Sequence, residues 1–351
     1  MERKREAKTE LKRALGLFDA TAISLGAIIG AGIFVVIGIV SGLAGPSVII
    51  SIILAGVIAS FTALSFAQLS AFMPREGGGY EFTYRLVSPF VGFLAGWMWV
   101  FSNVFIGAAV SLGFAQNLAT FFPFLSVNAV AVVFCLLFTL LNYVGVRQSA
   151  MVNDALVVAK VSILLFFIAY GLSFLRLSNF EPFLPKGFVG VLEAAALIFF
   201  AYGGYARVTT VAEEVRDASR TIPKAIILAL TMSTLLYVFI GFVAVGLVGS
   251  QSLAASSSPL ADAISVTGNS MAVFVMSLGA MIATASVLLM TILGVSRMTF
   301  AMARNGQFPT FLSQIHPRFQ TPHYAILITG LLSSVFVFGG FSRVVAVGTF
   351  A

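Results

Sequence analysis

Long apolar runs separated by short polar loops make up most of the chain. A membrane-spanning helix needs about 20 apolar residues, and by this measure the runs predict nine spanning helices. They cover roughly residues 17–41, 46–72, 90–121, 127–146, 151–175, 189–211, 224–249, 270–300 and 323–340. A tenth apolar segment begins near Val344 and the chain stops within it at Ala351, which favours a fragment. The loops at 74–89 and 212–223 carry mixed charges, and we expect short interfacial helices there.

Three glycines interrupt the first apolar run. Gly26, Gly30 and Gly32 fall within seven residues, and glycine is among the least favourable residues in a helix. A break here would free backbone N–H and C=O groups that lipid cannot pair, so they would face protein, water or a polar solute. Close helix packing through the small residues Gly26 and Gly30 explains the same pattern equally well.

A second interruption, FFAYGGY at 199–205, follows five helices later. Corresponding interruptions in two halves indicate inverted repeats around a solute site near mid-membrane. The sequence therefore predicts an all-α membrane protein with a five-plus-five inverted-repeat fold and broken helices 1 and 6. We expect a cytosolic arm at 1–16, a first repeat at 17–175 and an incomplete second repeat at 189–351, ending near the start of helix 10.

Composition and charge agree with a membrane protein. The chain is 59% hydrophobic and 9% charged, with a mean hydropathy of +1.04, whereas soluble domains are about 25% charged. With the amino terminus inside, sixteen of the twenty Lys and Arg residues, Arg207 and Arg297 among them, fall in cytosolic segments. This asymmetry follows the positive-inside rule, so the net charge of +7 needs no nucleic-acid partner. We expect a multi-pass protein of the cell membrane.

Residue patterns for other functions are absent from the sequence. Within the predicted helices, no ionisable pair stands at catalytic spacing, no phosphate-binding loop occurs, and Cys135 is the single cysteine. The sequence therefore predicts neither an enzyme nor a cofactor or metal site. It assigns no oligomeric state.

Four motifs occur in a characteristic order. They are GAIIGAGIF at 26–34, PREGGGY at 74–80, FFAYGGY at 199–205 followed by AEE at 212–214 and RTIP at 220–223, and SR at 296–297 followed by MARNG at 302–306. In this order they resemble the amino acid, polyamine and organocation transporter superfamily. The resemblance implies secondary transport of amino acids or related amines in the five-plus-five fold.

An amino acid substrate brings a carboxylate and an ammonium group. If helix 1 breaks near Gly30, the backbone N–H groups of Gly30, Ala31 and Gly32 suit the carboxylate, because the positive end of a half-helix attracts an anion. The resemblance implies the same carboxylate site. It places the ammonium against backbone carbonyls of Ile28, Phe200 and Gly203.

The aromatic residues of helix 6 are candidate gates. The resemblance implies that Phe200 closes over the substrate, and Tyr205 lies further along the same segment. Ordinary packing is the alternative for both rings. In many relatives a Glu follows the second aromatic, whereas Ala206 and Arg207 follow it here. This departure favours neutral over cationic substrates.

Lys160 stands deep in the fifth apolar run, where a charge is costly and indicates function by default. The position resembles the helix 5 Lys of proton-coupled family members, which occupies the place of a sodium ion in sodium-coupled relatives. Its amine is expected to reach the helix 1 break and Ser286. A Lys held permanently by carbonyls is the alternative.

Ser102 and Asn103 are candidate cavity residues, although interhelical hydrogen bonds explain them equally well.

We therefore expect a transporter of amino acids, neutral ones in particular, that is coupled to protons and works by alternating access. The expected partners are an amino acid, a proton and the lipid bilayer. A proton-independent exchanger and a non-transporting sensor with the same fold are the alternatives.

Overall fold

The computed structural model describes residues 10–339, and its regular secondary structure in this range is helical, apart from a single bridge between Leu15 and Val215. Residues 1–9 of the predicted arm and the tenth segment near Val344 lie outside the described residues. The α-helices are α1 (Leu17–Ile28), α2 (Ala31–Ala44), α3 (Val48–Phe72), α4 (Gly79–Leu86), α5 (Pro89–Phe121), α6 (Val127–Val144), α7 (Val146–Gly171), α8 (Gly187–Phe199), α9 (Ala218–Ala255), α10 (Pro259–Ser265), α11 (Ser270–Arg304) and α12 (His323–Phe336). The 3-10 helices are η3 (Gly45–Ser47), η4 (Leu172–Phe174), η5 (Leu177–Phe180), η6 (Phe200–Glu214), η7 (Thr310–Ser313) and η8 (Val337–Gly339).

Seven helical stretches in the described range are long and apolar enough to cross a membrane. One of them, Gly32–Phe72, joins α2 to α3, and two further apolar helices at Leu17–Ile28 and His323–Gly339 are shorter. Together these stretches account for the nine predicted runs.

The two loops predicted to hold interfacial helices differ. α4 occupies the first one, as expected. The prediction for 212–223 is wrong, because η6 runs to Glu214 and α9 already begins at Ala218. Asp217 adopts a left-handed conformation (φ 45°) between them, and this sharp turn leaves no room for a separate helix.

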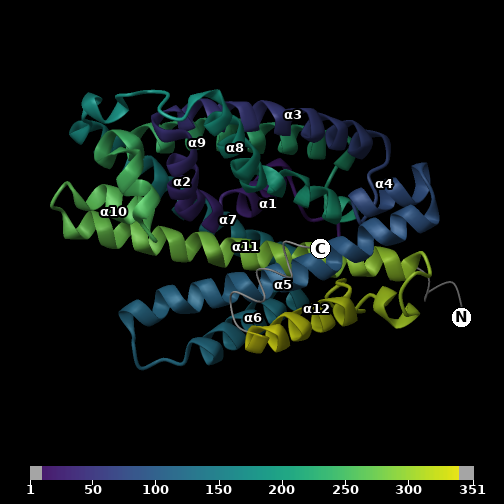
Figure 1. Ribbon diagram of the computed structural model, residues 1–351. Helices are drawn as coiled ribbons and strands as arrows, with labels where there is room; N and C mark the ends of the chain where they lie inside the picture. The colour runs from purple at the N-terminus through teal and green to yellow at the C-terminus, as the bar shows by residue number, and fades with distance from the viewer. Residues whose placement is uncertain (1–9, 340–351) are drawn as a thin grey trace, which may run out of the picture.

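The helices pack in two groups with α1 between them (Figure 1). α3 packs against α8 and α9 along one side of the molecule, and α11 packs against α5 on the other, with α6 and α12 beyond. α1 contacts α9, η6, α7 and α11. The broken first helix therefore touches both groups.

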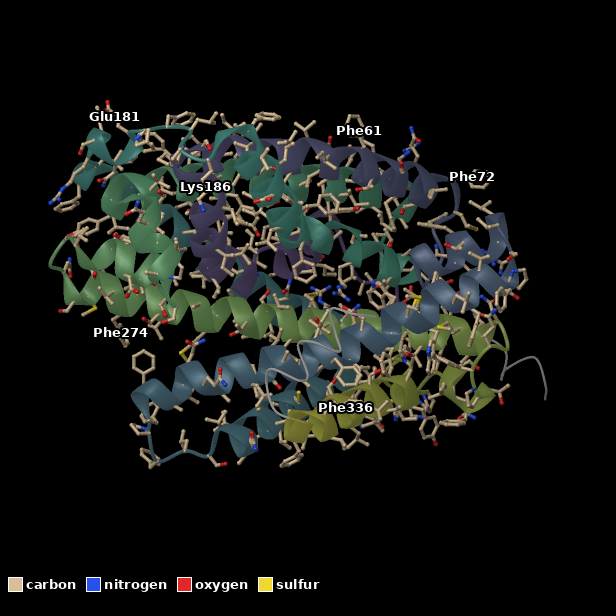
Figure 2. The ribbon with its side chains drawn as sticks, viewed as in Figure 1. Phe61, Phe72, Glu181, Lys186, Phe274 and Phe336 are labelled. Atoms are coloured by element: carbon tan, nitrogen blue, oxygen red, sulfur yellow. The ribbon has the colours of Figure 1, made fainter. Side chains whose placement is uncertain are left out.

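The exterior of the helix bundle is apolar. Phe61 and Phe72 point outward from α3 (Figure 2) and are 67% and 77% exposed. A contiguous apolar surface of this kind is unfavourable in water, whereas lipid covers it at no cost. The fold is that of an integral membrane protein.

Candidate functional site

The first helix is broken where the glycine cluster predicts. α1 ends at Ile28, Ile29 and Gly30 leave helical geometry, and α2 begins at Ala31. Helix ends leave backbone groups without intrahelical partners. The carbonyls at the end of α1 and the N–H groups at the start of α2 are therefore presented together.

Lys160 from α7 lies at this break. Its Nζ donates to the carbonyl oxygens of Gly26 (3.0 Å) and Ile29 (2.5 Å) and to Ser286 Oγ from α11 (3.1 Å). Lys160 and Ser286 are completely buried. An ammonium group has three donors and no acceptor, so these three oxygens match its capacity. In the described range, no carboxylate is among its partners.

Asn153 completes this network, and sequence reasoning missed it. Its Nδ2 donates to the carbonyl of Ala22 (2.9 Å), and its Oδ1 accepts from Ser286 Oγ (2.8 Å). A signal was available, because Asn153 stands seven positions before Lys160 and so shares its helix face. Two helices, α7 and α11, thus hold the end of α1.

The sixth membrane segment changes helix type at its predicted interruption. α8 ends at Phe199, and the chain continues as the 3-10 helix η6, with a non-helical residue at Val211. A Cβ added to Gly204 would lie 2.4 Å from the backbone atoms Ala27 C and Ile28 N. Only a residue without a side chain fits this approach, so η6 contacts α1 directly beside the break.

Tyr237 from α9 is a second residue that the sequence did not reveal. Its hydroxyl donates to the carbonyl of Ile28 at 2.8 Å. This carbonyl is a predicted ammonium contact. The backbone N–H of Gly30 donates to the same oxygen at 3.0 Å, so these two hydrogen bonds use both lone pairs of the carbonyl.

The predicted gate residues lie in different surroundings. Phe200 is 68% exposed, and a Cβ added to Gly203 would meet nothing within 4 Å. Tyr205 is buried, its hydroxyl donates to Thr62 Oγ1 at 2.7 Å, and its ring packs edge-on against Phe66. Tyr205 is therefore attached to α3, whereas Phe200 is not enclosed.

Asn103 is buried and Ser102 is partly buried on α5. Asn103 Nδ2 donates to the carbonyl of Trp99 (2.9 Å), and its Oδ1 accepts from Arg207 Nη2 (3.0 Å). Arg207 was expected in a cytosolic segment, and the structure places its side chain between helices, with the guanidinium packed against the Trp99 ring.

Glu214 and Arg297 form a fully buried ion pair at the α4 end of the bundle. Arg297 donates from Nε and Nη2 to the two carboxylate oxygens at 3.1 and 3.0 Å. Arg297 was also expected in a cytosolic loop, but burial of both partners places it inside the protein.

Two more carboxylates adjoin this pair. Glu213 pairs with Arg304 at 2.8 Å. Glu76 and Glu213 each accept a hydrogen bond from the other's backbone N–H, at 3.0 and 3.2 Å. Burial, with Glu214 and Glu213 nearby, raises the pKa of Glu76 well above its ordinary value. These contacts form an acidic cluster of Glu76, Glu213 and Glu214 bound to basic residues of α11.

Comparisons with known proteins agree with this architecture. The profile of the family described as amino acid permease matches residues 15–351. The branched-chain amino acid permease BcaP of Bacillus subtilis (strain 168) is 33% identical over an alignment of 345 residues that covers 93% of this chain and 74% of the relative. The methylthioribose transporter of the same organism is 33% identical over 360 residues, covering 97% of this chain and 77% of the relative.

A solved structure shares the fold at low sequence identity. It is a Na+-coupled sialic acid symporter in a substrate-bound, outward-open state, with a TM-score of 0.68 and 12% identity over 96% of this chain and 76% of that one. The broken helices and the two packed helix groups thus define a transporter of the five-plus-five inverted-repeat class. Within that class, the chain belongs to the amino acid permease family. It is a multi-pass membrane protein whose relatives are transporters, not enzymes.

Proposed function

We propose that the protein carries neutral amino acids across the cell membrane together with a proton, by alternating access. The family supports amino acid transport. Ala206 stands where many relatives have a Glu after the helix 6 aromatics, and the absence of that carboxylate supports a neutral substrate. The similarity to a branched-chain amino acid permease supports the same conclusion. The excess of Lys and Arg in the predicted cytosolic segments supports a cytoplasmic amino terminus.

The substrate site of this proposal lies at the two interruptions. The N–H groups of Gly30, Ala31 and Gly32 at the start of α2 bind the carboxylate. The carbonyls of Ile28, Phe200 and Gly203 receive the ammonium, which replaces the Gly30 N–H at the Ile28 oxygen and so releases that N–H for the carboxylate. Phe200 is the gate over this site, since its ring is free of enclosing contacts. Ser102 stands on the same helix as Asn103 and is a further candidate pocket residue.

Proton coupling in this proposal depends on the match between Lys160 and its three oxygens. A charged Lys160 fills all three acceptors, whereas a neutral amine has one donor fewer. Loss of the proton therefore weakens the contacts that hold α1 at its break. This gives the two protonation states different preferences for the arrangement of the helices, which is the requirement for coupling.

A proton-independent exchanger is the second candidate, and one observation favours it. Every donor of Lys160 has a partner, which also suits a fixed cation that stays charged and stabilises the break. The two candidates share the substrate site and the alternating movement of the predicted repeats, 17–175 and 189–351. They differ only in whether Lys160 releases its proton.

Uptake into proteoliposomes tests the proposal. With an inward proton gradient and no sodium, we expect labelled leucine to accumulate, and Lys160→Ala to abolish accumulation while exchange survives. Lys186→Ala is the matched control, because Lys186 Nζ also donates to a backbone carbonyl, that of Gly42 at 2.6 Å, but from an exposed position (Figure 2). Exchange without accumulation in the unmodified protein would favour the exchanger. Binding without any flux would indicate a sensor.

A further inference from the structure

Arg207 occupies an unusual position for a charged residue. It stands on η6, four positions after Gly203, and its guanidinium carbon lies 4.8 Å from the centre of the Trp99 ring. A Cβ added to Gly294 of α11 would lie 2.7 Å from Arg207 Cδ and 2.8 Å from Nη1. The side chain is therefore packed between α5 and α11, in space that the glycine leaves open.

One end of this guanidinium has no partner. Nη2 donates to Asn103, but Nη1 is buried and makes no hydrogen bond within the described part of the chain. The ion pairs found among the described residues involve Arg75, Arg85, Arg297 and Arg304, and not Arg207. Arg207 is partly buried, and a charge that is partly removed from water without an opposite charge is costly, so this arrangement favours a bound anion.

Arg207 is among the residues that line a cavity of about 270 Å³. Its lining includes Gly203, Ala206, Arg207, Thr209 and Trp99, and none of the residues that line it is acidic. Because space is open at Gly203, the cavity extends from the helix 6 interruption to Arg207. A solute at the interruption therefore has a path to the guanidinium.

We propose that Arg207 binds a carboxylate of the transported amino acid in this cavity. The inference rests on the proposed amino acid transport and adds a contact separate from the N–H groups of the helix 1 break. Guanidinium and carboxylate match in charge and in planar geometry. The carboxylate has two sources: the α-carboxylate of a neutral substrate that moves along the cavity, or the side chain of an acidic substrate.

The chain supplies its own probe for this site. Trp97 and Trp99 are its two tryptophans, so Trp97→Phe leaves only the indole that stacks on Arg207. We expect its fluorescence to change saturably on titration of the purified protein with acetate or leucine. Leucinamide, which has no carboxylate, should give no change. A response to chloride as large as that to acetate would overturn the proposal.

Two substitutions in the Trp97→Phe background assign the response to Arg207. Arg207→Gln should weaken the apparent affinity for acetate at least tenfold, roughly the loss of one charge-assisted contact. Arg318→Gln is the matched control and should change nothing, since Arg318 also stacks on an aromatic ring, Phe319 at 5.6 Å, but away from the cavity. Unchanged affinity in Arg207→Gln would refute the site. If Arg207→Gln does not fold, Arg207→Lys is the second variant. It keeps the charge but not the planar guanidinium, so we expect it to bind acetate several-fold more weakly than the Trp97→Phe protein does. Equal binding by the two proteins would refute the site.

Substrate comparison separates the two carboxylate sources and the two proposals. If glutamate binds about tenfold more tightly than leucine, the carboxylate at Arg207 is that of the substrate side chain. If the two bind equally, it is the α-carboxylate. A fluorescence response without any uptake would refute transport and leave the site in place. Uptake without the response would refute the site alone.

Discussion

At the scale of residues, the break in the first helix is stabilised by polar side chains from other helices. Lys160 and Asn153 of α7, Ser286 of α11 and Tyr237 of α9 all donate to carbonyls near the end of α1 or to each other. In a bilayer an unpaired carbonyl costs several kcal/mol. These four side chains therefore make an interrupted helix tolerable at membrane depth.

Tyr237→Phe tests one of these contacts. Removal of the hydroxyl takes a donor from the Ile28 carbonyl, so we expect unfolding free energy to fall by about 1 kcal/mol, measured as a lower melting temperature. Tyr205→Phe is the control and should cost less, because its hydrogen bond to Thr62 is only partly buried, whereas the bond from Tyr237 to the Ile28 carbonyl is buried. Equal melting temperatures for the two variants would argue against a special role for the Ile28 carbonyl.

At the scale of elements, the two interruptions differ in kind. The first is a gap of two residues between two α-helices, whereas the second is a change from α-helix to a 3-10 helix of 15 residues. The two segments touch where Gly204 meets the backbone of Ala27 and Ile28. The close approach at this point requires a position that carries no side chain.

Gly204→Ala should therefore disrupt this contact. The added Cβ would meet backbone atoms at 2.4 Å, and backbone cannot move aside as a flexible side chain can. We expect a loss of about 1–3 kcal/mol in stability and a clearly lower yield of monodisperse protein on size exclusion. Gly203→Ala is a neighbouring control with open space around it and should fold normally. A stable, well-folded Gly204→Ala protein would contradict the close approach.

The glycines in the first apolar run are a local signal that located the break in helix 1, but they fitted close helix packing equally well, and only the structure shows that the helix is broken there. Local signals also located the end of the α-helix at Phe199. They did not reveal that η6 stays helical to Glu214, because a 3-10 helix has no distinctive residue pattern. The Glu214–Arg297 pair joins residues 83 positions apart, so only the tertiary structure shows it. For the same reason the burial of Arg207 and Arg297 was not predicted, since a positive charge near the end of an apolar run resembles a cytosolic anchor.

At the scale of the whole molecule, the acidic cluster joins the ends of several helices. Glu76 follows α3, Glu213 and Glu214 end η6, and Arg297 and Arg304 belong to α11. The backbone N–H groups of Ala14 and Leu15 also donate to the Glu214 carbonyl, both at 3.0 Å. Under the proposed alternating access, opening of this side of the molecule requires these contacts to separate. Their strength therefore sets the balance between the closed and open arrangements.

The stability of the cluster should depend on pH through Glu76. Its pKa in the folded protein lies well above the ordinary 4.5, because burial and the neighbouring Glu214 oppose its charge. The folded state therefore keeps a proton that the unfolded state releases, and stability falls as pH rises above 4.5 towards the raised pKa.

Glu76→Gln removes this dependence, because its neutral amide has nearly the same shape as the protonated carboxyl. Between about pH 5 and pH 8, we expect the melting temperature of the unmodified protein to decline relative to that of Glu76→Gln. Glu181→Gln, at an exposed position on the periphery (Figure 2), should follow the unmodified protein. Parallel curves for Glu76→Gln and the unmodified protein would mean that Glu76 binds its proton equally in the folded and unfolded states. The cluster would then be a fixed contact, and pH would not alter its strength through Glu76.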